Sequence, residues 1–227
     1  MTNSIDKKMI ESSKDAVFTY IELEYDNGKG EWKAKDEENQ TAVKEYKTET
    51  TQILDHTSSS ITGFKATLIK RTDEHGNISK SLAIAGTDGP LAVNDLVADA
   101  NLLNKDVPVG QLKAMTEFVD RLIAEGKISP DDDLTVTGHS LGGAEAQIMT
   151  AVYSDHVDRA YTVNSPGAAD LVEMPNIEQQ TGWDAKTIEH YKDFFANRDK
   201  VGDKIVNIQA DQGHSFIANM NEDIGSV

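Results

Sequence analysis

The segment Gly-His-Ser-Leu-Gly-Gly at residues 138–143 constrains the fold more than any other part of this 227-residue chain. It matches the pattern Gly-x-Ser-x-Gly, follows a short apolar stretch, LTVT, and precedes a stretch with helical periodicity. A strand that turns this sharply into a helix holds the serine in a strained conformation and crowds the residues two positions away on either side. Gly138 and Gly142 therefore predict a nucleophile elbow, with the Ser140 hydroxyl lifted above the edge of a sheet.

A serine hydroxyl becomes a nucleophile only when a base accepts its proton. His214 follows the last predicted strand, in the segment QGHSF, where a base belongs if the order along the chain is serine, acid, histidine. His139 lies inside the elbow and is expected to be structural. The other four histidines are expected on loops or beside other elements: His56, His75, His156 and His190.

The acid that orients the histidine is expected between Ser140 and His214, at the carboxyl end of a strand. The segment HYKDFFAN is predicted to run into a strand that ends near Asn197. Asp199 comes two residues later and is the preferred acid. Asp203, next to a glycine and before the last strand, is the alternative.

Two backbone N–H groups are expected to stabilise an oxyanion. The Leu141 N–H is one, because it lies at the start of the helix that follows the elbow. The second is expected from Thr87, which follows the predicted strand end at Gly86 and offers a backbone N–H and a hydroxyl.

The pattern of apolar residues predicts strands that alternate with helices. A hairpin is expected over residues 64–87, with a turn at DEHGN, and helices over 93–103, 111–126 and 141–154. Further strands are expected over 134–138, in RAYTVNSPG and in KIVNIQA, and two less regular helices over 5–23 and 37–54. Residues 168–186 are expected to form an irregular surface excursion, with a lid as the alternative. Alternation of this kind implies an α/β fold with a mixed, mostly parallel central sheet and helices on both faces.

Composition excludes several classes of function. Lysine and arginine total 22 against 39 aspartate and glutamate, a net charge of −17, which argues against binding to nucleic acid. There is no cysteine, so disulfide scaffolds, cysteine-type zinc sites and a cysteine nucleophile are excluded. The triple aspartate at 131–133 is expected to be a solvated loop, since no EF-hand pattern surrounds it, and no metal site is predicted.

Four local segments together resemble the class 3 lipase family, the fungal-type triacylglycerol lipases with their bacterial relatives and related phospholipases. They are GHSLGGAEA, AIAGTDG, TVNSPG and NRDKV, between residues 83 and 201. The last resembles the acid loop of the family, with one residue fewer between its asparagine and aspartate. Ala85 stands where the family often has arginine. The resemblance implies an α/β-hydrolase fold and hydrolysis of carboxylic esters, with acyl lipids as substrates and no cofactor.

The chain is expected to form a single hydrolase domain over residues 1–227, with a polar, partly helical N-terminal extension at 1–60 and a core at 64–216. Its expected partner is a small-molecule or lipid ester, met by transient contact at a lipid interface without a transmembrane segment. The first residues lack the apolar stretch of a secretory signal, which leaves the cytoplasm and non-classical secretion both open. Two alternatives remain: a thioesterase or acyltransferase that uses the same triad, and a hydrolase fold that binds a ligand without catalysis.

Overall fold

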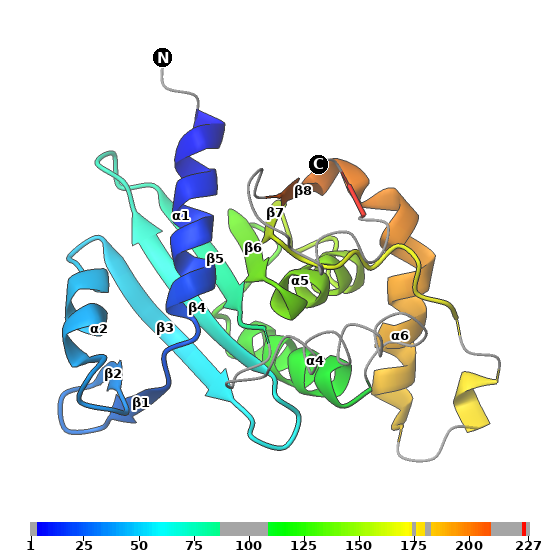
Figure 1. The fold of residues 1–227 in the computed structure, drawn as a ribbon, viewed down its shortest axis with the longest axis horizontal. Coiled ribbons are helices and arrows are strands. Elements are labelled where there is room, and N and C mark those ends of the chain that lie inside the picture. The colour runs from blue at the N-terminus through cyan, green and yellow to red at the C-terminus, as the bar shows by residue number, and fades with distance from the viewer. Residues whose placement is uncertain (1–3, 87–108, 174–175, 180–182, 210–223, 226–227) are drawn as a thin grey trace.

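The computed structural model describes residues 4–86, 109–173, 176–179, 183–209 and 224–225 (Figure 1). The α-helices of this part are α1 (Ser4–Phe18), α2 (Gln40–Tyr46), α4 (Val109–Ala124), α5 (Leu141–Val152) and α6 (Ala185–Asn197). The strands are β1 (Leu23–Asp26), β2 (Glu31–Ala34), β3 (Thr51–Ser58), β4 (Lys65–Thr72), β5 (Ile78–Ile84), β6 (Leu134–His139), β7 (Arg159–Val163) and β8 (Ile205–Ile208). Three short 3-10 helices complete the list: η1 (Ile177–Gln179), η2 (Arg198–Lys200) and η3 (Gly202–Lys204). No helix in these ranges is long and apolar enough to cross a membrane.

A six-stranded sheet organises the molecule in the order β3-β4-β5-β6-β7-β8. The pairs β3–β4 and β4–β5 are antiparallel, whereas β5–β6, β6–β7 and β7–β8 are parallel. The carboxyl ends of β5 to β8 therefore meet at one edge of the sheet. The predicted α/β architecture, with a mixed and mostly parallel central sheet, is confirmed.

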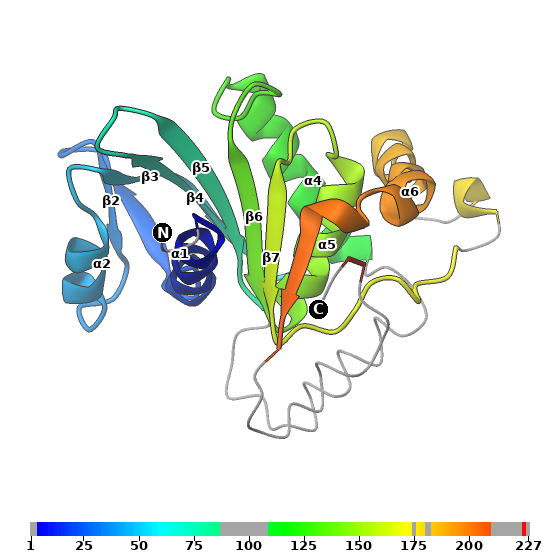
Figure 2. The same cartoon turned by 90° about the horizontal axis from the view of Figure 1, so that it is seen from above.

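Helices cover both faces of this sheet. Figure 2 shows α1 on one face, and α4, α5 and α6 on the other. The residues of α5 from Leu141 to Ala151 are buried, because this helix lies between the sheet and the outer helices. On the opposite face, Asp15 of α1 forms an ion pair with Arg71 of β4 and accepts a hydrogen bond from the Tyr46 hydroxyl of α2.

The strongest sequence patterns are confirmed. In the β4–β5 hairpin, the Asp73 carboxylate accepts the backbone N–H groups of His75 and Asn77, as expected of the predicted turn. Helix α4 buries its apolar stripe in the main core, and Gly126 ends it with a positive φ of 68°. The buried residues of the stripe are Leu112, Met115, Phe118, Val119 and Leu122.

Weaker patterns gave wrong elements. The expected helix at 37–54 is instead the short α2 followed by β3, because the chain from Thr51 to Ser58 pairs with β4. The segment expected to run into a strand ending at Asn197 is helix α6, whose start is capped by the Asp184 side chain. The expected helix at 93–103 lies outside the described residues. In the expected surface excursion, Leu171 and Ile177 are buried in the main core.

The first 60 residues contribute to the central sheet as well as packing on it. Strand β3 is one of its two edge strands, and α1 covers one face (Figure 2). Strands β1 and β2 form a separate two-stranded sheet, and four buried side chains form a second small core: Phe18, Leu23, Ala34 and Val43. The predicted boundary between the N-terminal extension at 1–60 and the core at 64–216 therefore does not coincide with a break in the sheet.

Candidate active site

Ser140 stands between the end of β6 and the start of α5, as the elbow pattern predicts. Its φ of 55° and ψ of −131° lie in a region that L-residues rarely adopt, at a cost of about 1–3 kcal/mol. Two hydrogen bonds hold this conformation. The Ser140 N–H donates to the Val163 carbonyl at 3.0 Å, and the Ser140 carbonyl accepts the Gly143 N–H at 2.9 Å.

Three glycines make this turn sterically feasible. A Cβ atom on Gly138 would lie 2.0 Å from the Gly142 carbonyl oxygen, and one on Gly142 would lie 2.4 Å from the Ile84 carbonyl oxygen. A Cβ on Gly143 would lie 2.2 Å from the Ser165 Cβ. These approaches are far inside van der Waals contact, so the elbow excludes any side chain at the three positions.

The Ser140 side chain is buried at the carboxyl edge of the sheet. The residue is 7% exposed, and its Oγ has no hydrogen-bond partner among the residues that the structure describes. His214, the base predicted from the sequence, lies outside the described residues.

The described histidines beside the elbow and in the core have structural partners. Burial lowers the pKa of His139, whose Nδ1 lies 3.2 Å from the Tyr20 hydroxyl. His56 lies in β3 rather than on the expected loop; burial lowers its pKa to about 4, and its Nδ1 lies 2.9 Å from Thr67 Oγ1. The Nε2 atom of His190 lies 3.1 Å from a carboxylate oxygen of Asp120. None of these rings is paired with Ser140.

The strand end that should carry the second oxyanion donor lies against the elbow. A Cβ on Gly86 would be 3.0 Å from the His139 carbonyl oxygen and 3.3 Å from the Leu141 nitrogen. The structure thus brings Gly86 and Leu141 together. Thr87, the next residue, lies outside the described residues.

Asp199 and Asp203 lie at the other end of the sheet. Asp199 is in η2 and Asp203 in η3, so both precede β8. Ile205, the first residue of β8, pairs with Ala160 of β7, which in turn pairs with Val136 of β6. Val136 precedes Ser140 by four residues, which is about 13 Å along a strand. The start of β8 is therefore about that far from Ser140 along the strand direction. The Asp199 side chain is 85% exposed and lies 3.4 Å from the Arg198 Nε. The structure does not bring either carboxylate to Ser140, because the strand expected to end at Asn197 is a helix.

Sequence reasoning missed one buried acid in the helix that follows Ser140. Glu145 of α5 is 5% exposed, and burial raises the pKa of its carboxyl to about 8. Its Oε1 has no hydrogen-bond partner within the described part of the chain. A glutamate in the small and apolar run GGAEAQIM was the one signal that could have drawn attention to it.

The triple aspartate is involved in ion pairs with lysines. Asp132 accepts the Lys80 ammonium at 2.7 Å, and Asp133 accepts that of Lys8 at 2.9 Å. Across the ranges described above, no group of three or more His, Asp or Glu side chains is placed to hold a metal ion.

Comparison with known proteins gives one family match. Residues 92–171, which include the elbow, α5 and β7, match the model of the family "Lipase (class 3)". No curated protein matches the sequence. Among solved structures, a mutant form of MDLA from Penicillium cyclopium is similar over 74% of this chain, with 20% sequence identity and a TM-score of 0.48. This chain spans 65% of that protein's length.

Proposed function

We propose that this chain, whose residues 92–171 match the model of the family "Lipase (class 3)", is a serine hydrolase that cleaves carboxylic esters of acyl lipids. The observation that carries the proposal is the conformation of Ser140. A buried hydroxyl on a strained turn between strand and helix costs stability, and it is retained where it serves a reaction. The family match supports the ester as the bond that is cleaved.

The proposed mechanism forms an acyl-enzyme on Ser140. The Ser140 Oγ attacks the ester carbonyl carbon while His214 accepts the hydroxyl proton. The negative charge that develops on the carbonyl oxygen is stabilised by the N–H groups of Leu141 and Thr87. The alcohol then leaves with the proton from His214. Water next attacks the acyl-enzyme by the same route and releases the carboxylic acid.

A third group must hold His214 in the correct tautomer. The sequence proposes Asp199 for this role, with Asp203 as the alternative. The position of both at the amino end of β8 argues against them.

Ser140→Ala tests the proposed nucleophile. We expect a loss on the order of 10⁶ in kcat on p-nitrophenyl esters, because a triad without its nucleophile retains almost no chemistry. A fluorophosphonate probe should label the wild type at Ser140, as read by peptide mass spectrometry, and should not label the variant. Activity across ester chain lengths, measured beside a phospholipid, then identifies the preferred acyl substrate.

Ser165→Ala is the matched control, because Ser165 is also buried and also packs against the start of α5. It should be labelled at Ser140 and should stay within about tenfold of wild-type activity, as a change outside the reacting atoms does. A Ser140→Ala variant that folds and keeps a tenth of the activity would remove Ser140 as the nucleophile. Labelling without ester hydrolysis would favour acyl transfer or ligand binding.

A further inference from the structure

A tyrosine from the N-terminal segment lies between the two strand ends of the candidate site. Tyr20 follows α1, and its ring meets the His139 ring edge-on with centroids 6.1 Å apart. Its hydroxyl accepts the Gly86 N–H at 3.0 Å and lies 3.2 Å from His139 Nδ1. Gly86 directly precedes Thr87, and His139 directly precedes Ser140. One hydroxyl therefore links the residues just before the proposed oxyanion donor and the proposed nucleophile.

The Tyr20 hydroxyl and the Leu141 N–H both lie close to Gly86. A Cβ on Gly86 would lie 2.8 Å from the Tyr20 hydroxyl oxygen and 3.3 Å from the Leu141 nitrogen. The Tyr20 hydroxyl is therefore a close neighbour of the place where two oxyanion donors must converge.

The donors and acceptors of this group are compatible with one another. Burial lowers the pKa of His139, which favours a neutral ring with an unprotonated nitrogen. The Gly86 N–H donates to the Tyr20 oxygen, and the Tyr20 hydroxyl can then donate its proton to His139 Nδ1.

The backbone around Tyr20 is fixed on the sheet. The Lys65 ammonium donates to the Tyr20 carbonyl at 3.2 Å. The neighbouring Thr19 hydroxyl donates to the Ala83 carbonyl at 3.3 Å and lies 3.1 Å from the Thr67 hydroxyl. Because β4 and β5 supply these partners, the hydroxyl has a defined position relative to the end of β5.

We propose that Tyr20 is a positioning residue for the oxyanion hole, which sets the distance between Gly86, just after the end of β5, and the Leu141 N–H. The inference rests on the proposed function. Oxyanion donors act only within about 2.7–3.1 Å of the developing charge, and a misplacement of about 1 Å can cost 10²-fold in rate. The N-terminal segment is then part of the catalytic unit, although it supplies no reacting group.

Tyr20→Phe is the test, because it removes the hydroxyl and keeps the ring. We expect kcat to fall by about 10- to 100-fold, with KM within about twofold of the wild type, since the lost positioning acts on the transition state. An aryl boronic acid, which forms a tetrahedral adduct on a serine, should bind more weakly by a similar factor. Tyr25→Phe is the matched control, because Tyr25 is in the same N-terminal segment and is 48% exposed; it should leave kcat and boronate affinity unchanged.

The outcomes separate the inference from the function on which it rests. Thermal unfolding and circular dichroism establish that Tyr20→Phe is folded. Equal kcat and boronate affinity in the two proteins would overturn the inference while the function stands. A proportional loss of active, phosphonate-titratable protein, with unchanged kcat per labelled site, would assign Tyr20 a structural role only and would also overturn it. A wild type that neither hydrolyses esters nor reacts at Ser140 would overturn the proposed function, and the inference with it.

Discussion

At the scale of single residues, Glu145 is the group whose burial has the clearest energetic consequence. Burial removes water from the Glu145 carboxyl and so disfavours its charged form, which raises its pKa to about 8 from an ordinary value of 4.5. Between these two pH values the folded state holds a proton that the unfolded state has released. The free energy of unfolding therefore falls as the pH rises from the unfolded pKa of Glu145 to its folded pKa, by at most about 1.4 kcal/mol per pH unit.

Glu145→Gln should remove this dependence. We expect the free energy of unfolding of the variant, relative to that of the wild type, to increase from pH 5 to pH 8, as measured by urea denaturation at each pH. Glu189→Gln is the control, because Glu189 is exposed on α6, and its difference from the wild type should not follow this pH course. Parallel curves for Glu145→Gln and the wild type would mean that the carboxyl is ionised in the folded protein.

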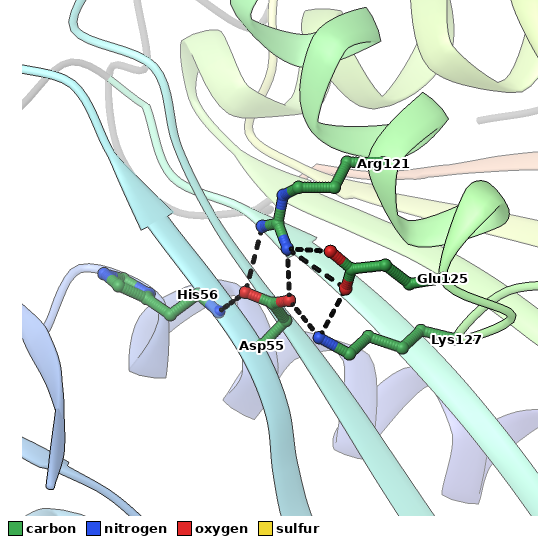
Figure 3. A network of polar contacts seen from close by, with 5 residues as sticks. All are labelled: Asp55, His56, Arg121, Glu125 and Lys127. Atoms are coloured by element: carbon green, nitrogen blue, oxygen red, sulfur yellow. Dashed lines mark hydrogen bonds and ion pairs between the residues drawn. The ribbon is translucent and has the colours of Figure 1, made fainter. Parts of the chain in front are cut away.

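At the scale of secondary structure elements, a charged network joins β3 to the end of α4 (Figure 3). Asp55, at a β-bulge in β3, has a side chain that is 5% exposed. Its two oxygens accept the Arg121 guanidinium at 2.8 and 3.1 Å and the Lys127 ammonium at 2.7 Å. Burial alone would raise the pKa of Asp55, but these hydrogen bonds outweigh it and hold the pKa below its ordinary value.

Asp55→Asn should lower the free energy of unfolding by about 2 kcal/mol at neutral pH, because it leaves two cations without their shared carboxylate. Since the folded pKa is depressed, this stabilisation is present above the unfolded pKa and is lost as the pH falls through the folded one. The gap between the variant and the wild type should therefore close in acid. Asp131→Asn, at an exposed position, is the control for the loss of one negative charge. If the difference in free energy of unfolding between Asp55→Asn and the wild type stayed the same at low pH, the ionised Asp55 carboxylate would not be its source.

At the scale of the whole molecule, the polarity of the sheet bears on which acid could serve the proposed base, His214. Ser140 follows β6 at the carboxyl edge, and Asp199 and Asp203 precede β8 at the amino edge. Asp211 lies outside the described residues; in the sequence it follows Ile208, the last residue of β8, by three positions. We expect Asp199→Asn to keep kcat within about twofold and Asp211→Asn to lower it by about 10⁴, the usual effect of a lost tautomer. Steady-state hydrolysis of a p-nitrophenyl ester measures both.

The reverse ranking of the two variants would restore Asp199 as the acid. Asp203→Asn belongs in the same series, because it shares the amino edge with Asp199 and should behave like it.

The elbow and the elements around it could be predicted from the sequence, because their constraints are local. A glycine two residues on either side of Ser140 is required by contacts within one turn, and the stripe of α4 repeats within one helix. The Asp73 turn depends on a side chain that bonds its own neighbouring backbone. Such features need no knowledge of the rest of the chain.

The tertiary structure alone decided the features that depend on distant partners. Whether residues 51–54 become strand or helix depends on the pairing of β3 with β4. The segment before Asn197 is a helix because its apolar face, with Tyr191 and Phe194, packs into the main core. Its helical state moves Asp199 to the opposite edge of the sheet from Ser140. The contact of Tyr20 with Gly86 and His139 joins positions 66 and 119 residues apart, and no local pattern encodes such a distance.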